Sequence, residues 1–434
     1  MKRCPECGRD YNDDSLSFCL DDGSELLFGP ASDGVPTALF SHESDPDQNT
    51  ELMPAPAHRA PHPGQLWRLG AAALALIVIA GGSLYWFGLR DTRPTIQGSF
   101  RDVTSPAYDY YLRGKLDSIS QNRDRNQNAI EILKDVVARD PGFAPGYAAL
   151  ARAYAIKADF YDQSEQAKLY DDARLAAEKA LAIDPLLAEA HLARGAIIWN
   201  RINRFQHEQS IQAYKKAIAL DPSSEEAHSQ LGFVYYHIGL FDKSEPELQK
   251  ATELDPSNPI TRFRIGQLKA LQTDYAGALA VFKTIPRESN AIIVDRAMAG
   301  VLFHLGRTDE AWKIVNDFLP NNSDEGGNVT SVKAMLLAKA GRVQEAESAI
   351  RDAIEIGHNF QHFHHASYNI ATAYALMDNR EEALKWLRFT SDEGFPCYPL
   401  FERDEGLDNL RQDDRFKALM AELKQQWERY DSTL

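Results

Sequence analysis

Small and apolar residues recur at fixed offsets through most of the chain after residue 105. The clearest unit covers residues 222–256, which are 34 residues apart, and its Ser244, Leu248 and Ala251 are spaced by four and then three residues. Residues at these spacings lie on one face of an α-helix. Seven further triplets repeat the offsets: Ala129, Leu133, Val136; Ala173, Ala177, Ala180; Ser210, Tyr214, Ala217; Ala278, Phe282, Ile285; Ala311, Val315, Phe318; Ala346, Ile350, Ala353; and Ala383, Leu387, Thr390. The pattern predicts about eight repeated units between residues 106 and 392.

Each unit also carries residues that let two helices pack together and then end. Gly232 leaves room for a second helix to approach the first, and Tyr235 fills the space beside that contact. Asp255-Pro256 ends the unit, because proline cannot continue a helix and disfavours the α conformation in the residue before it. Asp-Pro pairs close the earlier units at Pro141, Pro185 and Pro222.

These offsets resemble the tetratricopeptide repeat (TPR), in which two antiparallel helices meet through a small residue on each. The resemblance implies an all-α fold, a TPR superhelical solenoid of about eight helix pairs. Residues 106–427 are similar to the TPR tails of bacterial single-span regulators, and residues 107–114 (AYDYYLRG) are similar to how those tails begin. In that family the tail follows a winged-helix, cyclase or Ser/Thr kinase module, and residues 1–68 are too short to hold one.

Two units exceed the usual period. Pro141 and Pro185 are 44 residues apart, and Pro185 and Pro222 are 37 apart, with the extra residues around 160–169 and 201–207. Lengthened helices or a protruding turn are expected there.

The repeats are assigned to residues 106–395, and residues 396–434 to a C-terminal capping helix and tail. Apolar residues at helical spacing end at Trp427. The charged outer face of this helix suits a cap over the apolar edge of a solenoid.

Residues 69–89 (LGAAALALIVIAGGSLYWFGL) contain no charged side chain. As a helix, this run would be about 31 Å long, close to the ~30 Å hydrocarbon thickness of a bilayer. Arg68 and Arg90 flank the run, and aromatic residues lie near both of its ends. We therefore predict a transmembrane helix over residues 66–89, in preference to a buried globular helix or a cleaved signal peptide.

The orientation of this helix is harder to predict from the flanking charges. The positive-inside rule leans weakly toward a cytoplasmic carboxyl side. A thiol metal site, however, is easiest to keep reduced in the cytoplasm. We expect a single-pass protein of the inner membrane, with a cytoplasmic N-terminus and an extracytoplasmic TPR domain.

Three of the four cysteines lie within the first twenty residues. Cys4-Pro-Glu-Cys7-Gly is a metal knuckle, and Cys19 with Asp22 stands where a second pair of thiolates would be. Residues 1–26 therefore resemble a zinc ribbon with one ligand replaced, and a structural zinc held by Cys4, Cys7, Cys19 and Asp22 is the favoured prediction. A site completed by water or another chain, and a knuckle that binds nothing, are the alternatives.

The remaining segments are interpreted as linkers. Residues 27–65 hold seven prolines and too little apolar periodicity to bury a core, and residues 90–105 form a shorter linker after the predicted membrane helix. The chain carries 47 Lys and Arg against 63 Asp and Glu, a net charge of −16. This charge disfavours binding to nucleic acid or to an anionic membrane surface.

Candidate chemistry is sparse. Residues 357–365 (GHNFQHFHH) hold four histidines, which could bind a transition metal, but we interpret them as an inter-repeat loop with exposed imidazoles. Cys397 has no evident catalytic partner and is interpreted as a packed or idle thiol. No phosphate loop, nucleophile elbow or kinase catalytic loop is present in the sequence, and no small-molecule substrate is evident. We predict that the protein is not an enzyme.

The TPR resemblance implies an inner groove, lined by the first helix of each pair, that holds an extended peptide or a helix of a partner. The predicted partner-binding residues are Arg152, Trp199, Asn200, Phe233, Tyr236, His237, Phe263, Gln267, Phe303 and His304. The Lys and Asn set that clamps a terminal carboxylate in chaperone-binding members is not visible, so the groove is expected to recognise apolar or aromatic side chains. Alternatively, some of these rings pack between neighbouring repeats.

Together these features predict a membrane-anchored TPR scaffold or adaptor that binds a protein partner. One alternative is a sensory protein in which occupancy of the solenoid is communicated to the N-terminal ribbon. An enzyme with its site in the solenoid is the least favoured alternative.

Overall fold

The structure is a computed structural model. It describes residues 2–3, 10–11, 27–28, 106–120, 122–160, 163–287 and 291–434. The chain divides into two units, residues 1–93 and residues 94–434. The predicted membrane helix over residues 66–89 and the linker over 90–105 lie outside the described residues. Within the described ranges, no helix has both the length and the apolar composition needed to cross a membrane.

The described part of the first unit is a small antiparallel sheet. Its strands are β1 (Lys2–Arg3), β2 (Asp10–Tyr11) and β3 (Leu27–Phe28), with β1 in the middle. β1 and β2 flank the segment that holds Cys4 and Cys7. All four predicted metal ligands, including Cys19 and Asp22, lie outside the described residues, so the zinc site stays a prediction.

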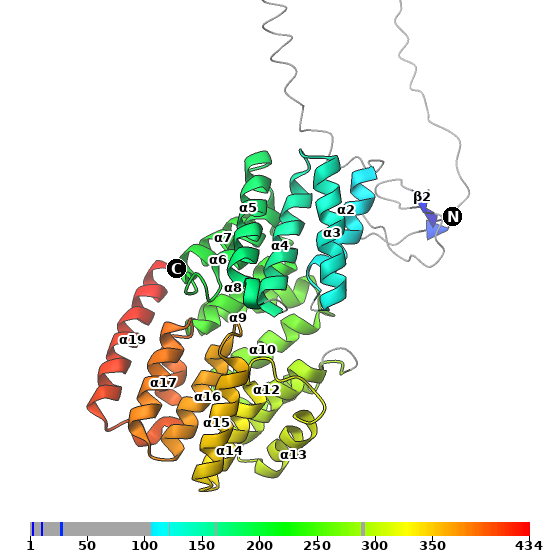
Figure 1. The fold of residues 1–434 in the computed structure, drawn as a ribbon. Helices are drawn as coiled ribbons and strands as arrows, with labels where there is room; N and C mark the ends of the chain where they lie inside the picture. The colour runs from blue at the N-terminus through cyan, green and yellow to red at the C-terminus, as the bar shows by residue number, and fades with distance from the viewer. Residues whose placement is uncertain are drawn as a thin grey trace, which may run out of the picture. The chain divides into compact units, whose positions relative to one another are not determined.

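The second unit is built from antiparallel helix pairs, which Figure 1 shows in chain order from cyan to red. The pairs within its described residues are α2 (Pro106–Ser118) with α3 (Arg123–Arg139), α4 (Ala144–Phe160) with α5 (Gln166–Ile183), α6 (Ala188–Ile198) with α7 (His207–Leu220), α8 (Glu225–His237) with α9 (Phe241–Leu254), α10 (Pro259–Leu271) with α11 (Tyr275–Phe282), α12 (Ala291–His304) with α13 (Thr308–Phe318), α14 (Asn328–Lys339) with α15 (Val343–Gly357), and α16 (Phe363–Leu376) with α17 (Arg380–Asp392). The prediction of an all-α solenoid of about eight helix pairs is confirmed.

Shorter and terminal elements complete the second unit. A 3-10 turn, η1 (Gln163–Glu165), precedes α5, and a second one, η2 (Glu405–Leu410), lies between α18 (Tyr398–Arg403) and α19 (Asp414–Thr433).

The Asp-Pro pairs end helices as the sequence predicts. At the end of α9, the Asp255 N–H donates to the Ala251 carbonyl at 2.9 Å, and its side chain accepts the N–H of Ser257 at 2.9 Å. Asp thus satisfies backbone groups on both sides of the turn, while the following proline prevents the helix from continuing. The same C-cap occurs at the ends of α3, α5 and α7, at Asp140, Asp184 and Asp221.

Small residues allow the two helices of a pair to touch. A Cβ atom on Gly232 would lie only 2.7 Å from Cγ of Leu248, and Ser244 Oγ donates to the Gly232 carbonyl at 2.8 Å. Ser210 donates in the same way to the Gly195 carbonyl at 2.9 Å. All eight triplets of second-helix residues are buried, so the predicted inner face of these helices is confirmed.

The two long units accommodate their extra residues in different ways. The first has lengthened helices, α4 with 17 residues and α5 with 18. In the second, residues 199–206 form a turn that packs inward. Phe205, with a positive φ of 48°, is 2% exposed, and its ring lies 5.2 Å from that of His364. The expected protruding turn is therefore absent at this position.

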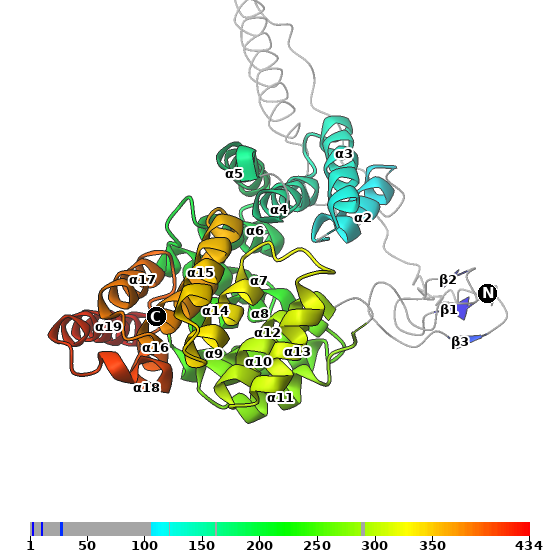
Figure 2. The ribbon, with the colours of Figure 1, turned by 60° about the horizontal axis from the view of Figure 1, so that its bottom comes forward.

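The C-terminal elements contact the middle of the solenoid as well as its last pair. Figures 1 and 2 show α19 beside α17. From α19, Trp427 Nε1 donates to the Gly239 carbonyl at 3.0 Å, and Arg201 after α6 pairs with Glu393 after α17 at 2.9 Å. The solenoid thus curls back on itself, and its two halves meet through α8, α9 and the segment from α16 to α19.

Candidate functional site

The first helices of successive pairs surround a concave cavity of about 1270 Å³. Helices α4, α6, α8, α10, α12, α14 and α16 all contribute side chains to its wall. Because the solenoid curls back, Gln361 and His362 before α16 line the same concave cavity as Arg152 on α4. The cavity therefore has walls from both halves of the solenoid.

The structure brings most of the predicted groove residues together. Those that line the concave cavity are Arg152, Trp199, Phe233, Tyr236, Phe263, Gln267 and His304. The other three, Asn200, His237 and Phe303, are buried behind it. Helical spacing predicts the inner face of a helix well, but it does not separate a residue on the cavity surface from one covered by a neighbouring helix.

Aromatic rings form one continuous part of the wall. The ring of Phe233 lies 5.1 Å from that of Trp199 and 5.3 Å from that of Tyr236. The Tyr236 hydroxyl donates to Gln267 Oε1 at 2.7 Å, and Trp199 Nε1 donates to His207 Nδ1 at 2.8 Å. These polar atoms are already hydrogen bonded within the chain, and Trp199 and Tyr236 are buried at 5% and 0% exposed. The half-buried Phe233 is therefore the ring of the three that presents an apolar face to the cavity, with the other two packed behind it.

A half-buried arginine lies beside this aromatic wall, and the sequence reasoning did not single it out. The guanidinium of Arg264 lies 4.6 Å from the Phe233 ring centroid, and its Nη1 donates to Ser229 Oγ at 2.7 Å. Burial lowers the pKa of Arg264, while the nearby Tyr236 and Tyr214 act in the opposite direction. Arg264 directly follows the predicted groove residue Phe263 on α10, and this position could have indicated that it lies near the cavity.

Ion pairs and hydrogen bonds occupy other charged groups of the wall. Arg152 on α4 forms an ion pair with Glu226 on α8, and Thr261 donates a hydrogen bond to Glu225. Burial raises the pKa of Glu225 although the Thr261 hydrogen bond opposes this. The first contact joins α4 to α8 and the second joins α10 to α8, so both fix the positions of first helices in the wall.

His304 lies at the end of α12, where the wall meets the C-terminal segment. Its ring stacks on Tyr275 at 4.5 Å, and its Nδ1 lies 3.8 Å from the buried carboxylate of Asp404. Burial lowers the pKa of His304 and outweighs the opposite effect of Asp404. The imidazole is therefore neutral near pH 7.

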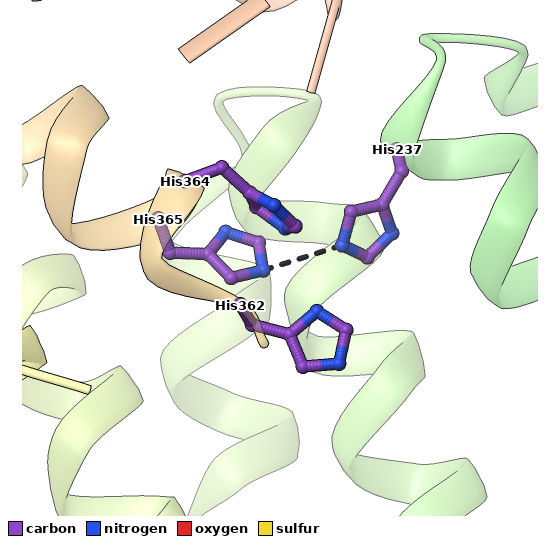
Figure 3. Close-up of side chains that lie close together, drawn as sticks. All are labelled: His237, His362, His364 and His365. Carbon is purple, nitrogen blue, oxygen red and sulfur yellow. Dashed lines mark hydrogen bonds between the residues drawn. The ribbon is translucent and has the colours of Figure 1, made fainter. Parts of the chain in front are cut away.

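Three of the four histidines of residues 357–365 are not exposed, which corrects the interpretation of an exposed loop: His364 is buried, His362 and His365 are half-buried, and His358 is exposed. Figure 3 shows His362, His364 and His365 converging on His237 from α8. Phe363, between His362 and His364 in the sequence, is buried in the hydrophobic core. The sequence shows that His362, His364 and His365 are close to one another along the chain. Their contact with His237, however, depends on the way the solenoid curls back on itself.

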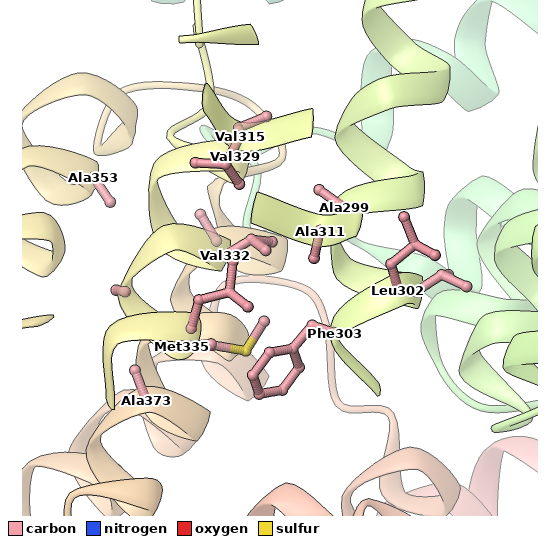
Figure 4. Close-up of a cluster of buried hydrophobic side chains, with 14 of the residues drawn as sticks. Ala299, Leu302, Phe303, Ala311, Val315, Val329, Val332, Met335, Ala353 and Ala373 are labelled. Carbon is pink, nitrogen blue, oxygen red and sulfur yellow. The ribbon is translucent and has the colours of Figure 1, made fainter. Parts of the chain in front are cut away.

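Phe303 and Asn200, two predicted groove residues that are buried, have structural roles. Phe303 packs in the core with Met335, as Figure 4 shows, and Lys339 Nζ lies 5.0 Å from its ring centroid. Asn200 accepts the N–H of Asn203 at 2.8 Å and donates to the Ile197 carbonyl, which shapes the turn after α6.

Cys397 is fully buried, as its interpretation as a packed thiol requires. Its Sγ lies 3.7 Å from the Tyr236 carbonyl oxygen. Burial raises the pKa of this thiol to about 12, so it is protonated and unreactive at neutral pH.

Comparison with known families identifies the repeats. Residues 206–239 match the family described as TPR repeat, and residues 225–258 match the family described as tetratricopeptide repeat. These ranges cover α7 to α9, and the same helix pairing continues on both sides of them. The chain therefore contains TPR repeats. No curated protein matches the chain.

Solved structures with a similar fold include several TPR proteins. The APC/C hetero-tetramer Cut9-Hcn1 has 19% identity and a TM-score of 0.47, covering 61% of this chain and 48% of that chain. A tetratricopeptide repeat protein from Parabacteroides merdae has 16% identity and a TM-score of 0.42, covering 64% and 100%. Yeast Tom70 has 16% identity and a TM-score of 0.38, covering 77% and 67%. This chain thus spans about half of the Cut9-Hcn1 chain.

Proposed function

We propose that the chain is a scaffold that holds an extended segment of a partner protein in the concave cavity. The observation that carries this proposal is the aromatic wall of the cavity, made by first helices that are adjacent in space. Its rings have their polar atoms satisfied internally, so contact with apolar side chains of a partner leaves no buried polar group unpaired. In this proposal the cavity has no catalytic role.

The partner segment should carry apolar or aromatic side chains. The ion pair between Arg152 and Glu226 leaves neither group free to clamp a terminal carboxylate. The Arg264 guanidinium lies over the Phe233 ring, so it can donate hydrogen bonds to a carbonyl or carboxylate oxygen of the partner beside the aromatic contact. We expect it to contribute orientation more than affinity.

Cavity variants test the proposal against a variant on the outer surface. Ile156 and Ile260 line the concave cavity, whereas Leu175 on α5 is 56% exposed and does not. Proteins crosslinked to the wild-type chain in cells should also be captured by Leu175→Glu and lost with Ile156→Glu and Ile260→Glu. Circular dichroism should show the same helical content for all three variants.

A photo-reactive amino acid at Gln267 locates the contact directly. It should crosslink to the same partner as the wild-type capture, and the crosslinked residues of the partner should be apolar. A partner retained by both cavity variants, or crosslinked only from position 175, would contradict binding in the cavity.

We also propose that residues 66–89 anchor the protein in the inner membrane, with its N-terminus in the cytoplasm. The uncharged run over 69–89, flanked by Arg68 and Arg90, supports this proposal. A fluorescent protein at the N-terminus and alkaline phosphatase at the C-terminus should both be active. The opposite pair of active fusions would reverse the orientation, and activity only in soluble fractions would exclude the anchor.

A structural zinc held by Cys4, Cys7, Cys19 and Asp22 remains part of the proposal. Three thiolates and a carboxylate supply the four ligands that such a site requires. The chain purified under reducing conditions should lose zinc when Cys4 and Cys7 are replaced by serine. Less than about a tenth of an equivalent attributable to these ligands would exclude the site.

A further inference from the structure

Four imidazoles from two distant segments converge where the solenoid curls back on itself. His237 is the last residue of α8, His362 caps α16, and His364 and His365 lie in the first turn of α16. One nitrogen from each ring can be chosen so that all four lie within 4.8 Å of one another. Figure 3 shows the four rings facing a common centre.

Hydrogen bonds fix which nitrogen of two rings is free. His237 Nδ1 lies 2.8 Å from the Phe233 carbonyl, and His364 Nδ1 lies 2.9 Å from the Glu393 carbonyl. A carbonyl only accepts hydrogen bonds, so each Nδ1 carries the proton and each Nε2 keeps a lone pair. Metal-binding histidines are held in this way, with the second nitrogen donating to a carbonyl or carboxylate.

Two nitrogens of the group have no hydrogen-bond partner among the residues that the structure describes. His362 Nδ1 and His364 Nε2 are both buried without a hydrogen bond. Buried polar atoms without a partner are uncommon and costly, at about 1–3 kcal/mol each. A ligand that engages these nitrogens would remove that cost.

One pair of nitrogens, at hydrogen-bond distance, already has the separation of two metal ligands. His237 Nε2 and His365 Nε2 lie 3.3 Å apart. Two nitrogens on one tetrahedral Zn²⁺, with bonds of about 2.0–2.1 Å, would be about 3.3 Å apart. Since the remaining ligand atoms are within 4.8 Å, small ring rotations would bring them to the same ion.

We propose that His237, His362, His364 and His365 form a binding site for one divalent transition-metal ion of the Zn²⁺ class. Imidazole is a ligand for Zn²⁺, Co²⁺, Ni²⁺ and Cu²⁺, and four nitrogen ligands without an open position suit a structural tetrahedral ion. The ion would fasten the end of α8 to the start of α16. It would thereby hold the curl that closes the concave cavity.

The environment keeps the rings in the form that binds metal. Burial lowers the pKa of His362 to about 3 and that of His365 to about 4, so both are neutral near pH 7. The positive charge of Arg264 also acts on His362 and opposes a second cation. Binding must therefore come from direct coordination, which favours transition metals over Ca²⁺ or Mg²⁺.

The ion also has a route to the site. His362 and His365 line the concave cavity, whereas His237 and His364 lie behind them. Metal can therefore enter from the cavity. The site depends neither on the predicted cysteine ligands nor on the identity of a protein partner, so it can be tested separately from the proposed function.

Cobalt titration of the full chain tests the site. Cys4, Cys7 and Cys19 are replaced by serine to leave only the histidines, and metal is removed with a chelator. We expect one equivalent of Co²⁺ to bind with the visible absorption of a tetrahedral nitrogen site, and one equivalent of Zn²⁺ to displace it. Zn²⁺ should raise the midpoint of thermal unfolding of the same protein.

Single variants assign the ligands. His362→Gln and His365→Gln should weaken Co²⁺ binding by at least about tenfold, since even the loss of an outer-shell partner has an effect of that size. His358→Gln, next to the group but exposed, is the matched control and should bind as the parent does. If a ligand variant does not fold, the stoichiometry and spectrum of the parent protein decide. Absence of stoichiometric Co²⁺ binding in the parent, or equal binding by folded His358→Gln and His362→Gln, would overturn the proposal.

Discussion

Trp199 and His207 are joined by a hydrogen bond in which the indole Nε1–H donates to His207 Nδ1 at 2.8 Å. A nitrogen that accepts a hydrogen bond carries no proton, so this contact requires a neutral imidazole. Burial acts in the same direction and lowers the pKa of His207 to about 3. The ring also packs 6.1 Å from that of Tyr430 on α19, so its charge state bears on contacts of both α6 and α19.

This relationship predicts loss of stability in acid. An unfolded histidine has a pKa of about 6.5, so between pH ~6.5 and ~3 the unfolded chain binds the proton that folded His207 excludes. The free energy of unfolding should therefore fall as the pH drops below about 6.5, by up to about 1.4 kcal/mol per pH unit from this one group. His207→Gln keeps an acceptor for Trp199 and removes the titration.

Thermal unfolding midpoints between pH 7 and pH 4.5 measure this effect. The midpoint of His207→Gln should fall less steeply than that of the wild type, although the buried histidines of α16 keep some slope in both. Exposed His358→Gln should follow the wild type. Parallel curves for wild type and His207→Gln would show that His207 is not the titrating group.

A second prediction concerns the close contact between α8 and α9. Gly232→Ala would place a Cβ atom 2.7 Å from Leu248 Cγ, so the two helices must separate or Leu248 must leave its rotamer. We expect a loss of about 1–3 kcal/mol, which is typical of overpacking. Adding Leu248→Val should recover part of it.

Gly300 on α12 is the matched control, and its replacement by alanine should change stability in the opposite direction. A Cβ atom there would meet only Val332 at 3.8 Å, an ordinary contact. Gly300→Ala should stabilise the protein by about 0.5–1 kcal/mol, because alanine has the higher helix propensity. Urea unfolding of the two variants checks both signs, and a stabilising Gly232→Ala would refute the packing argument.

The repeat architecture could be predicted because its determinants are local. Gly232 and Leu248 are 16 residues apart, and each Asp-Pro pair acts on its own helix end. The same offsets therefore identify every helix pair, including pairs that lack most of the residues typical of the repeat. The eight triplets carry enough of this signal to place all the second helices.

The curl of the solenoid could not be predicted in this way. It arises from single contacts between distant residues, such as Trp427 with Gly239 and Arg201 with Glu393, which have no period. His237 was predicted as a groove residue for its place on α8, but its neighbours are histidines of α16. Arg264 was not predicted, although it directly follows the predicted Phe263 on α10.

A third prediction concerns the buried carboxylate of Asp404. It accepts hydrogen bonds from the Tyr368 hydroxyl and from the Gly406 N–H, the latter at 2.8 Å. Asp404→Asn would direct amide hydrogens at one of these two donors, so we expect a loss of about 1–3 kcal/mol in the free energy of unfolding. Asp408→Asn, whose side chain is 60% exposed, should change stability by less than about 0.5 kcal/mol. Similar effects of the two substitutions on urea unfolding would contradict a specific role for Asp404.

The last prediction tests whether α19 holds the curl. Trp427 donates to the Gly239 carbonyl and packs 5.9 Å from the Tyr398 ring, so Trp427→Ala removes a contact on each side of the junction. Loss of one such hydrogen bond is worth about 1 kcal/mol, and the lost packing adds to it.

Hydrogen exchange should therefore speed up by about tenfold or more in two separate places, the amides of α19 and those around Gly239 before α9. Lys424→Ala, an exposed change on the same helix, should leave both regions as in the wild type. Faster exchange confined to α19 would mean that this helix covers the last repeats without holding the two halves together. Faster exchange in both regions, with α12 and α13 unchanged, is the pattern expected if Trp427 joins the two halves.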